Sequence, residues 1–294
     1  MIYLLLAILC SASINLGFTL VKARRLHNLT VTWFNYLTAS AVSLVLLLRA
    51  DLPAAAFRPA ALAGNMSGRI TADGSLTLAL LFGAVTGVIY IAALLATQYS
   101  ILRSGPSPTT MFGKLGSILP VLCSMALFGE RPGLLCWAGI AVAMAALVVY
   151  NWDGGFRMGW LLPATFLLSG LAELSNKLFS AWCDQAFKPL YLLCVFGTAF
   201  LLCSLLLLRE GRKAAIRPAD GAVGVFIGAV NLGSAFLTIR ALEELPAGVV
   251  FPALCAGVVL LIALAGRLFF QERLGKRGYA AIAMTAVSLI LLNL

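Results

Sequence analysis

Charged residues are scarce in this sequence, since Asp, Glu, Lys and Arg make up only 11% of its 294 residues. Soluble domains carry ~25% charged residues. Apolar residues reach 62%, against ~45–50% in soluble domains. This composition excludes an ordinary soluble enzyme and a disordered chain. It is typical of a polytopic membrane protein, whose apolar side chains face lipid.

Catalytic and cofactor motifs are also missing. His27 is the only histidine, which excludes His-based metal clusters and disfavours His-dependent acid–base catalysis. The sequence has no GxxxxGK[ST], GxSxG or HExxH motif. The seven cysteines form no CxxC pair and are interpreted as small apolar side chains. We therefore expect neither an enzyme nor a bound cofactor, and any driving force would be a proton or ion gradient.

The basic excess is the main charge feature, with 21 Lys and Arg against 11 Asp and Glu. In a soluble protein this excess would suggest nucleic acid. Here most basic residues fall between apolar runs, which points to contact with the lipid bilayer and not with nucleic acid. We expect an integral protein of a bacterial inner membrane. The loop charges alone predict that both termini lie outside the cytoplasm.

Ten charge-poor segments are long enough to be helical spans, each needing roughly 20 apolar residues. The predicted fold is therefore an all-α polytopic membrane protein with ten transmembrane helices. The spans are expected at 2–21, 30–48, 77–101, 107–128, 134–151, 158–181, 189–208, 221–241, 247–268 and 278–293. A mildly amphipathic stretch in the gap 50–76 predicts a short interfacial helix.

An internal repeat divides the chain. Residues 128–151 align without gaps to residues 270–293, with nine of 24 positions identical and a shared F-x-E-R-x-G start. Each half then holds five spans. An odd number of crossings makes the second half enter from the opposite side, so an inverted repeat is predicted, with five-helix units at 1–152 and 153–294. Glycines also repeat, at Gly83/Gly87 and Gly224/Gly228, and predict close-packing seams.

The five-plus-five layout and the F-x-E-R ending, preceded in the first half by Pro120, resemble the ten-helix EamA-like transporters of the drug/metabolite transporter superfamily. The resemblance implies secondary transport of small metabolites by alternating access. It also implies a cavity lined by helices one to four and six to nine, and termini inside the cytoplasm, against the charge count. One departure is Ile262, which stands where the repeat would place a second proline. Pro252 lies ten residues earlier.

Two segments also resemble the small multidrug resistance transporters. The run from Ile14 to Lys22 is similar to the first helix of that family, but Ile14 stands where the family has its essential glutamate. In the sixth predicted span, Leu171-Ala172-Glu173 matches the glutamate region. The resemblance implies that this chain keeps one carboxylate where the small dimers have two.

Three charged residues lie well inside predicted spans: Lys114, Glu173 and Lys177. Such charges cost roughly 2.5–3.5 kcal/mol on insertion scales, so they mark functional positions. Glu173 shares a polar helix face with Asn176 and Lys177. It is a candidate for proton exchange or cation binding, and the alternative is a structural ion pair with Lys177 or Lys114. Lys114 is either a site for a substrate anion or the partner of Glu173.

The remaining candidates for substrate contact are neutral. Asn15, Tyr90, Gln98 and Asn231 are polar or amphipathic residues inside apolar spans, where hydrogen bonding between helices is an equal explanation. Trp33 and Tyr36 open the second span. They are either residues of the aromatic belt at the membrane interface or a π surface for an organic cation.

These patterns predict a secondary active transporter, an antiporter or ion-coupled carrier, for a small-molecule substrate. The substrate class is a small polar metabolite or organic cation of amine or amino acid type, with proton coupling through Glu173. One chain holds both halves, so a monomer suffices for the cavity, and a dimer is left open. Two alternatives remain: a membrane-embedded enzyme for lipid-linked or small substrates, and a non-transporting membrane subunit.

Overall fold

The computed structural model describes residues 1–59, 61, 70–104, 106–129, 133–151, 160–210 and 217–269, and seven single positions between 277 and 291. This described part is helical and contains no strand. Its helices are α1 (Ile2–Ala23), α2 (Asn28–Leu48), α3 (Ala72–Ser104), α4 (Pro106–Leu115), α5 (Ile118–Phe128), α6 (Leu134–Asn151), α7 (Leu161–Trp182), the 3₁₀ turn η2 (Gln185–Phe187), α8 (Lys188–Glu210), α9 (Pro218–Glu244) and α10 (Ala247–Phe269).

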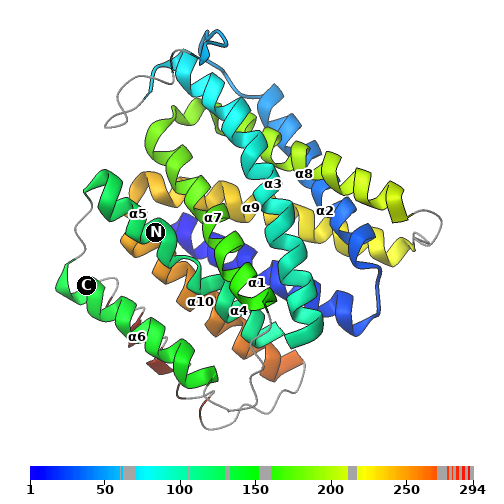
Figure 1. Ribbon diagram of the computed structural model, residues 1–294, viewed down its shortest axis with the longest axis vertical. Helices are drawn as coiled ribbons and strands as arrows, with labels where there is room; N and C mark the ends of the chain where they lie inside the picture. The colour runs from blue at the N-terminus through cyan, green and yellow to red at the C-terminus, as the bar shows by residue number, and fades with distance from the viewer. Residues whose placement is uncertain are drawn as a thin grey trace.

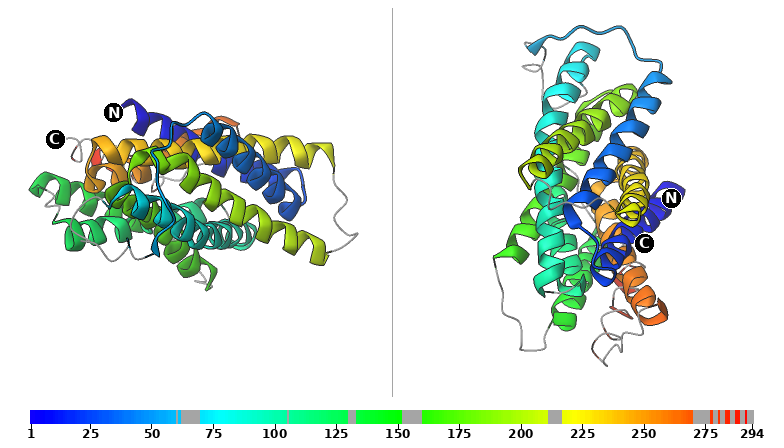
Figure 2. Two further views of the ribbon diagram at one scale, coloured as in Figure 1. Left: turned by 90° about the horizontal axis from the view of Figure 1, so that it is seen from above. Right: turned by 90° about the vertical axis from the view of Figure 1, so that its right-hand side faces the viewer.

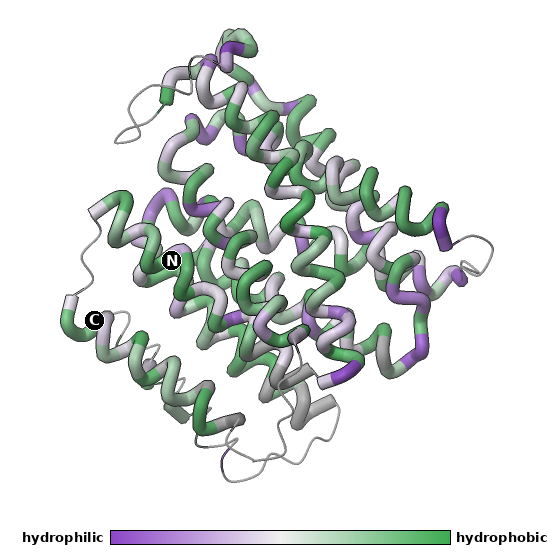
Figure 3. The backbone as a smooth tube through the Cα atoms, viewed as in Figure 1, coloured by the Kyte–Doolittle hydropathy of each residue, from purple (hydrophilic) through white to green (hydrophobic). Residues whose placement is uncertain are grey.

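Among the described residues, five helical segments are long and apolar enough to cross a membrane, judged by length and composition: those of α1, α2, α3, η2 with α8, and α9. Hydrophilic residues gather mainly at the helix ends and in the loops (Figure 3). Large apolar side chains such as Leu5, Leu44 and Leu201 are exposed on the outer surface. This arrangement suits lipid as the surrounding medium.

The helices lie in two layers, and α6 runs along one edge of the molecule (Figures 1 and 2). In one layer α1 packs against α9 and α10, and in the other α3 packs against α7 and α8. Helices α2 and α8 join the layers, since α2 contacts both α8 and α9. Aromatic rings fill this joint: the rings of Tyr36 on α2 and Phe196 on α8 lie with centroids 6.4 Å apart, and both side chains are fully buried.

Glycines allow two pairs of helices to approach closely. A Cβ added to Gly87 of α3 would lie 2.5 Å from the carbonyl oxygen of Val195 in α8. A Cβ added to Gly228 of α9 would lie 2.4 Å from the carbonyl oxygen of Asn35 in α2. Neither position has room for a side chain, so the interpretation of both glycine pairs as close-packing seams is confirmed.

The predicted single span 107–128 is wrong in one respect, because the chain breaks inside it. Helix α4 ends at Leu115, Gly116 and Ser117 form a turn, and α5 begins at Ile118. Pro120 has no amide hydrogen to donate to the carbonyl of Gly116, as a continuous helix would require. Gly116 also touches α7, where a Cβ would lie 2.3 Å from the carbonyl oxygen of Phe166.

Two other expectations meet the limits of the described residues. In the gap 50–76, residues 51–58 have no regular structure and α3 already begins at Ala72, while residues 60 and 62–69 lie outside the described part. The tenth predicted span, 278–293, falls mostly outside it. So do the Glu-Arg pairs at 130–131 and 272–273 that carry the sequence repeat.

Candidate functional site

A cavity of about 180 Å³ lies between the two layers. Its described lining comes from α1, α2, α3, α4, α7, α9 and α10. The resemblance to EamA-like transporters implied the seventh helix as well, but α8 contributes no described lining residue. Helix α8 packs mainly against α2 and α3, and these two helices supply lining residues instead.

An ion pair faces this cavity. Lys114 Nζ donates to Glu173 Oε1 over 3.3 Å, and the two side chains are 15% and 17% exposed. The hydroxyl of Ser117 donates to the other carboxylate oxygen, Oε2. Of the two partners that the sequence left open for Glu173, the structure selects Lys114.

The break between α4 and α5 holds this pair in place. Lys114 lies in the last turn of α4 and Ser117 directly precedes α5. A positive charge is favoured at a helix C-terminus and a negative charge at an N-terminus, so the broken helix stabilises both charges. The backbone carbonyl of Lys114 accepts from the amide of Ser117 over 3.1 Å and from the thiol of Cys255 on α10 over 3.4 Å, so this acceptor at the end of α4 is satisfied within the turn and by a neighbouring helix.

Ser117 falls on the same predicted helix face as Lys114, but it was not among the candidate site residues from the sequence. A signal for it exists, because Gly116-Ser117 followed by Pro120 is a breaker pattern inside an apolar segment. A turn at this point brings a hydroxyl and the start of a helix to the middle of the bundle.

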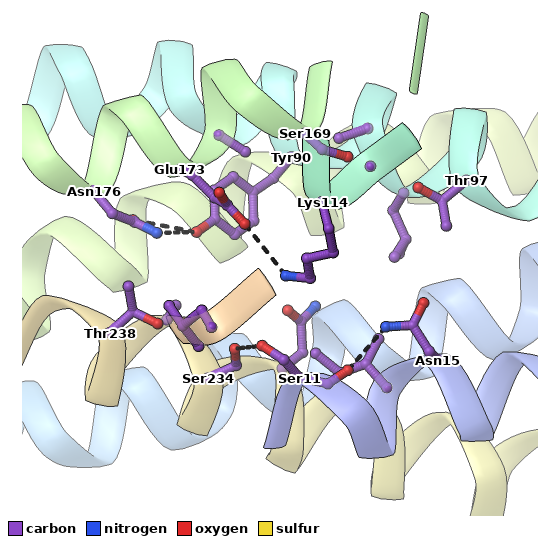
Figure 4. A pocket seen from close by; sticks show the side chains of 18 of the residues that line it. Ser11, Asn15, Tyr90, Thr97, Lys114, Ser169, Glu173, Asn176, Ser234 and Thr238 are labelled. Carbon is purple, nitrogen blue, oxygen red and sulfur yellow. Dashed lines mark hydrogen bonds and ion pairs between the residues drawn. The ribbon is translucent and has the colours of Figure 1, made fainter. Parts of the chain in front are cut away.

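A hydrogen-bonded group continues along the same wall. Asn176 Nδ2 lies 2.9 Å from the hydroxyl of Tyr90. The hydroxyl of Tyr36 donates to the carbonyl oxygen of Tyr90 over 3.0 Å. Figure 4 shows Glu173, Asn176, Tyr90 and Lys114 together on one side of the cavity. This wall therefore combines one ion pair with an amide and two phenols.

The opposite wall is neutral in its described lining, which comes from α1, α9 and α10. The hydroxyls of Ser11 and Ser234 lie 2.7 Å apart, and Asn15 Nδ2 donates to the carbonyl of Ser11 over 2.9 Å. Asn231 Nδ2 donates to Asn35 Oδ1 over 3.1 Å. Hydroxyl and amide groups thus face the ion pair across the cavity (Figure 4).

The lining residues recur with equal spacing on paired helices. Helix α1 lines the cavity with Ser11, Ile14, Asn15 and Phe18, and α7 lines it with Ser169, Ala172, Glu173 and Asn176. Helix α3 contributes Tyr90, Ala93, Leu94 and Thr97, and α9 contributes Asn231, Ser234, Ala235 and Thr238. Each set is one helical face, and the sets match position by position.

Three candidates from the sequence lie away from this cavity. Trp33 Nε1 donates to the hydroxyl of Ser204 over 2.9 Å and its ring packs against Phe200. Gln98 Nε2 donates to the hydroxyl of Thr32 on α2. The ammonium of Lys177 stands over the ring of Phe128, 5.3 Å from its centroid. Each of these contacts joins two helices and involves no residue of the cavity lining.

No family model matches this sequence, and no curated protein matches it. Among solved structures, 28 chains match. One of them, a crystal structure of a protein, superposes with a TM-score of 0.67 at 15% sequence identity, over 99% of this chain and 94% of that chain. A likeness at this identity shows a shared fold and no more than that.

Proposed function

We propose that this protein is a secondary active transporter that carries a small polar metabolite or organic cation, of amine or amino acid type, by alternating access. The observation that carries the proposal is the cavity between the two layers, with the Lys114–Glu173 ion pair in its wall. Buried charges in apolar helices are costly and mark substrate or ion pathways. Discontinuous helices at such a cavity are a recurring feature of secondary transporters.

The close glycine contacts support the proposed duplication of five helices, at 1–152 and 153–294. Gly83 and Gly87 of α3 meet the carbonyls of Tyr191 and Val195 in α8. In the other half, Gly224 and Gly228 of α9 meet the carbonyls of Val31 and Asn35 in α2. The two sets of contacts are equivalent if α3 of the first half corresponds to α9 of the second, and α2 of the first half corresponds to α8 of the second. In this ten-span proposal, α4 and α5 together count as the fourth span and residues 278–293 as the tenth.

The same exchange pairs α1 with α7 and revises one residue equivalence. When the lining sets of α1 and α7 are aligned, the residue equivalent to Glu173 is Asn15 and not Ile14. The proposed transporter thus has a carboxylate in one half and an amide at the equivalent position of the other. We keep the EamA-like transporters as the proposed family and a bacterial inner membrane as the proposed location.

Coupling in this proposal acts through the ion pair. A proton or cation that binds Glu173 removes the attraction that holds Lys114, and the Lys114 ammonium then needs another partner. The turn at Gly116 and Ser117 lies next to both residues, so breaking the ion pair also changes the contacts of the turn that joins α4 to α5. The two helix segments can then tilt separately.

Electrogenic uptake in proteoliposomes on solid-supported membranes tests the proposal. Amines, amino acids and sugar phosphates are screened at pH 6 and pH 8 with the wild type and with Glu173→Gln. The matched control is Glu244→Gln, because Glu244 is 49% exposed and pairs with the N-terminal ammonium far from the cavity. Gel filtration confirms that each variant is folded.

A substrate-dependent current that is lost in Glu173→Gln and kept in Glu244→Gln is the expected result. Equal currents in all three proteins would keep the transporter and remove Glu173 from its mechanism. Because electroneutral exchange produces no current, counterflow of radiolabelled substrate is measured as well. Absence of both current and counterflow over the whole panel would contradict transport and favour the membrane-enzyme or non-transporting alternative.

A further inference from the structure

We infer that the cavity selects zwitterions, in which an ammonium and a carboxylate are joined through one carbon atom, over amines and over carboxylic acids of the same size. The inference names the substrate class of the proposed transporter. It rests on the proposed function for transport, but its binding part can be tested without transport.

The ion pair presents two adjacent charges to the cavity. Ser117 occupies Oε2 of Glu173, which leaves Oε1 and the Lys114 ammonium, 3.3 Å apart, at the cavity wall. Among the described residues Glu173 is the only partner of that ammonium, although an ammonium has three donors. Figure 4 shows the end of Lys114 reaching into the space between the walls.

A ligand with one charge disturbs this pair. An amine that binds Glu173 competes with Lys114 and adds net positive charge to a largely buried site. A carboxylate that binds Lys114 adds net negative charge to the site and repels the Glu173 carboxylate. A buried charge that loses part of its compensation is strongly unfavourable.

A zwitterion avoids both costs. Its carboxylate binds Lys114 and its ammonium binds Glu173 Oε1, so four charges of alternating sign form a closed ring. The two charges of an α-amino acid are separated by about the same span as Nζ and Oε1, because a single carbon atom joins the groups that carry them. The pair stays intact and the net charge of the site does not change.

The rest of the cavity suits the remainder of such a ligand. The described lining opposite the pair is neutral, and it offers hydroxyls from α1 and α9, including Ser11 and Thr238. Apolar side chains, among them Phe18 and Leu254, complete it. A cavity of roughly 150 Å³ holds benzene, so one of about 180 Å³ limits the ligand to a small side chain.

Isothermal titration calorimetry on the full-length protein in nanodiscs tests this selection. The probes are leucine, alanine and serine, each with the amine that lacks its carboxylate and the acid that lacks its ammonium. For leucine these are 3-methylbutylamine and 4-methylpentanoate. We expect at least one amino acid to bind tenfold or more tightly than both of its analogues. The inference is overturned if none of the three amino acids does so, which includes the case in which none of the nine probes binds.

Variants separate recognition by the pair from a structural role. In Lys114→Gln the preferred probe is expected to change from the amino acid to the amine, and in Glu173→Gln to the acid. The double variant Lys114→Gln/Glu173→Gln keeps the amide hydrogen bonds without buried charge and is expected to bind the three probe types within threefold of one another. Glu244→Gln is expected to keep the order of the wild type. A purely structural pair would lower all affinities together, which would contradict the inference.

Counterflow with the same probes distinguishes the two proposals. Amino acids that bind with the expected order but show no counterflow would contradict transport and leave the zwitterion site. Counterflow of amines without amino acids would support transport and overturn the zwitterion site.

Discussion

Glu173 keeps a donor on each of its carboxylate oxygens, Lys114 on one and Ser117 on the other. Hydrogen bonds to charged groups contribute ~1.5–3 kcal/mol each. A carboxylate in an apolar bundle needs such partners, since an unpaired charge there is strongly unfavourable. The local sequence therefore supplies both donors within four residues, at the end of one helix and the start of the next.

Replacing Ser117 by alanine tests this role at the residue scale. Ser117→Ala removes one donor from Glu173 and is expected to lower the free energy of unfolding by ~1.5–3 kcal/mol, measured by thermal unfolding in detergent. The matched control is Ser13→Ala, because the hydroxyl of Ser13 only donates to the carbonyl of Leu9 in its own helix. That change is expected to stay within ~0.5 kcal/mol. Equal effects of the two substitutions would mean that Ser117 does not support Glu173.

The break between α4 and α5 is stabilised by a glycine contact with α7. A Cβ on Gly170 would lie 2.5 Å from the carbonyl oxygen of Gly116, one turn before Glu173. Two backbones thus meet where the helix is interrupted, and the contact sets the distance between Glu173 and its two donors. At the scale of elements, the close approach of α7 to the break is what assembles the site.

Gly170→Ala is expected to move α7 away from the break and to destabilise the protein by ~1–3 kcal/mol, as overpacking does. The control is Gly197→Ala in α8, where an added Cβ would meet nothing within 4 Å. Alanine is a better helix former than glycine by ~0.5–1 kcal/mol, so this control is expected to be neutral or stabilising. Thermal unfolding of both variants measures the difference. A stable Gly170→Ala protein would show that the contact at Gly116 is loose.

The described helices form two layers with the cavity between them, and its matched lining faces on α1 and α7 and on α3 and α9 come from different halves of the chain. Only one of the two walls carries charge in its described lining. The cavity is therefore close to two-fold symmetric in the positions of its lining residues. Its two walls differ in charge, so one wall can recognise a charged ligand. The proposed zwitterion selectivity depends on that asymmetry.

The proposed ten spans predict that both termini lie on one side of the membrane. Fusions of alkaline phosphatase and of green fluorescent protein to each end measure this directly, since the first is active only outside the cytoplasm and the second fluoresces only inside. We expect the two ends to give the same result. Opposite results would mean an odd number of spans and would contradict the inverted repeat. If both ends lie outside the cytoplasm, the prediction from the loop charges is correct. If both lie inside, the orientation implied by the family resemblance is correct.

The sequence by itself determined that the protein is helical and apolar enough for a membrane, and it identified single polar faces. Long apolar runs need no tertiary information, because every backbone polar group in lipid must be satisfied within the segment. Helical periodicity likewise placed Glu173 and Asn176 on one face, and both line the cavity.

Only the tertiary structure decided which helix each polar face meets. Gln98 and Trp33 looked as suitable as Tyr90, yet they bond to Thr32 and Ser204 between helices. The choice of Lys114 over Lys177 as the partner of Glu173 depends on a contact across 59 residues and on the turn after Leu115. Periodicity reports a face of one helix, whereas partners are set by how closely glycines let the backbones approach.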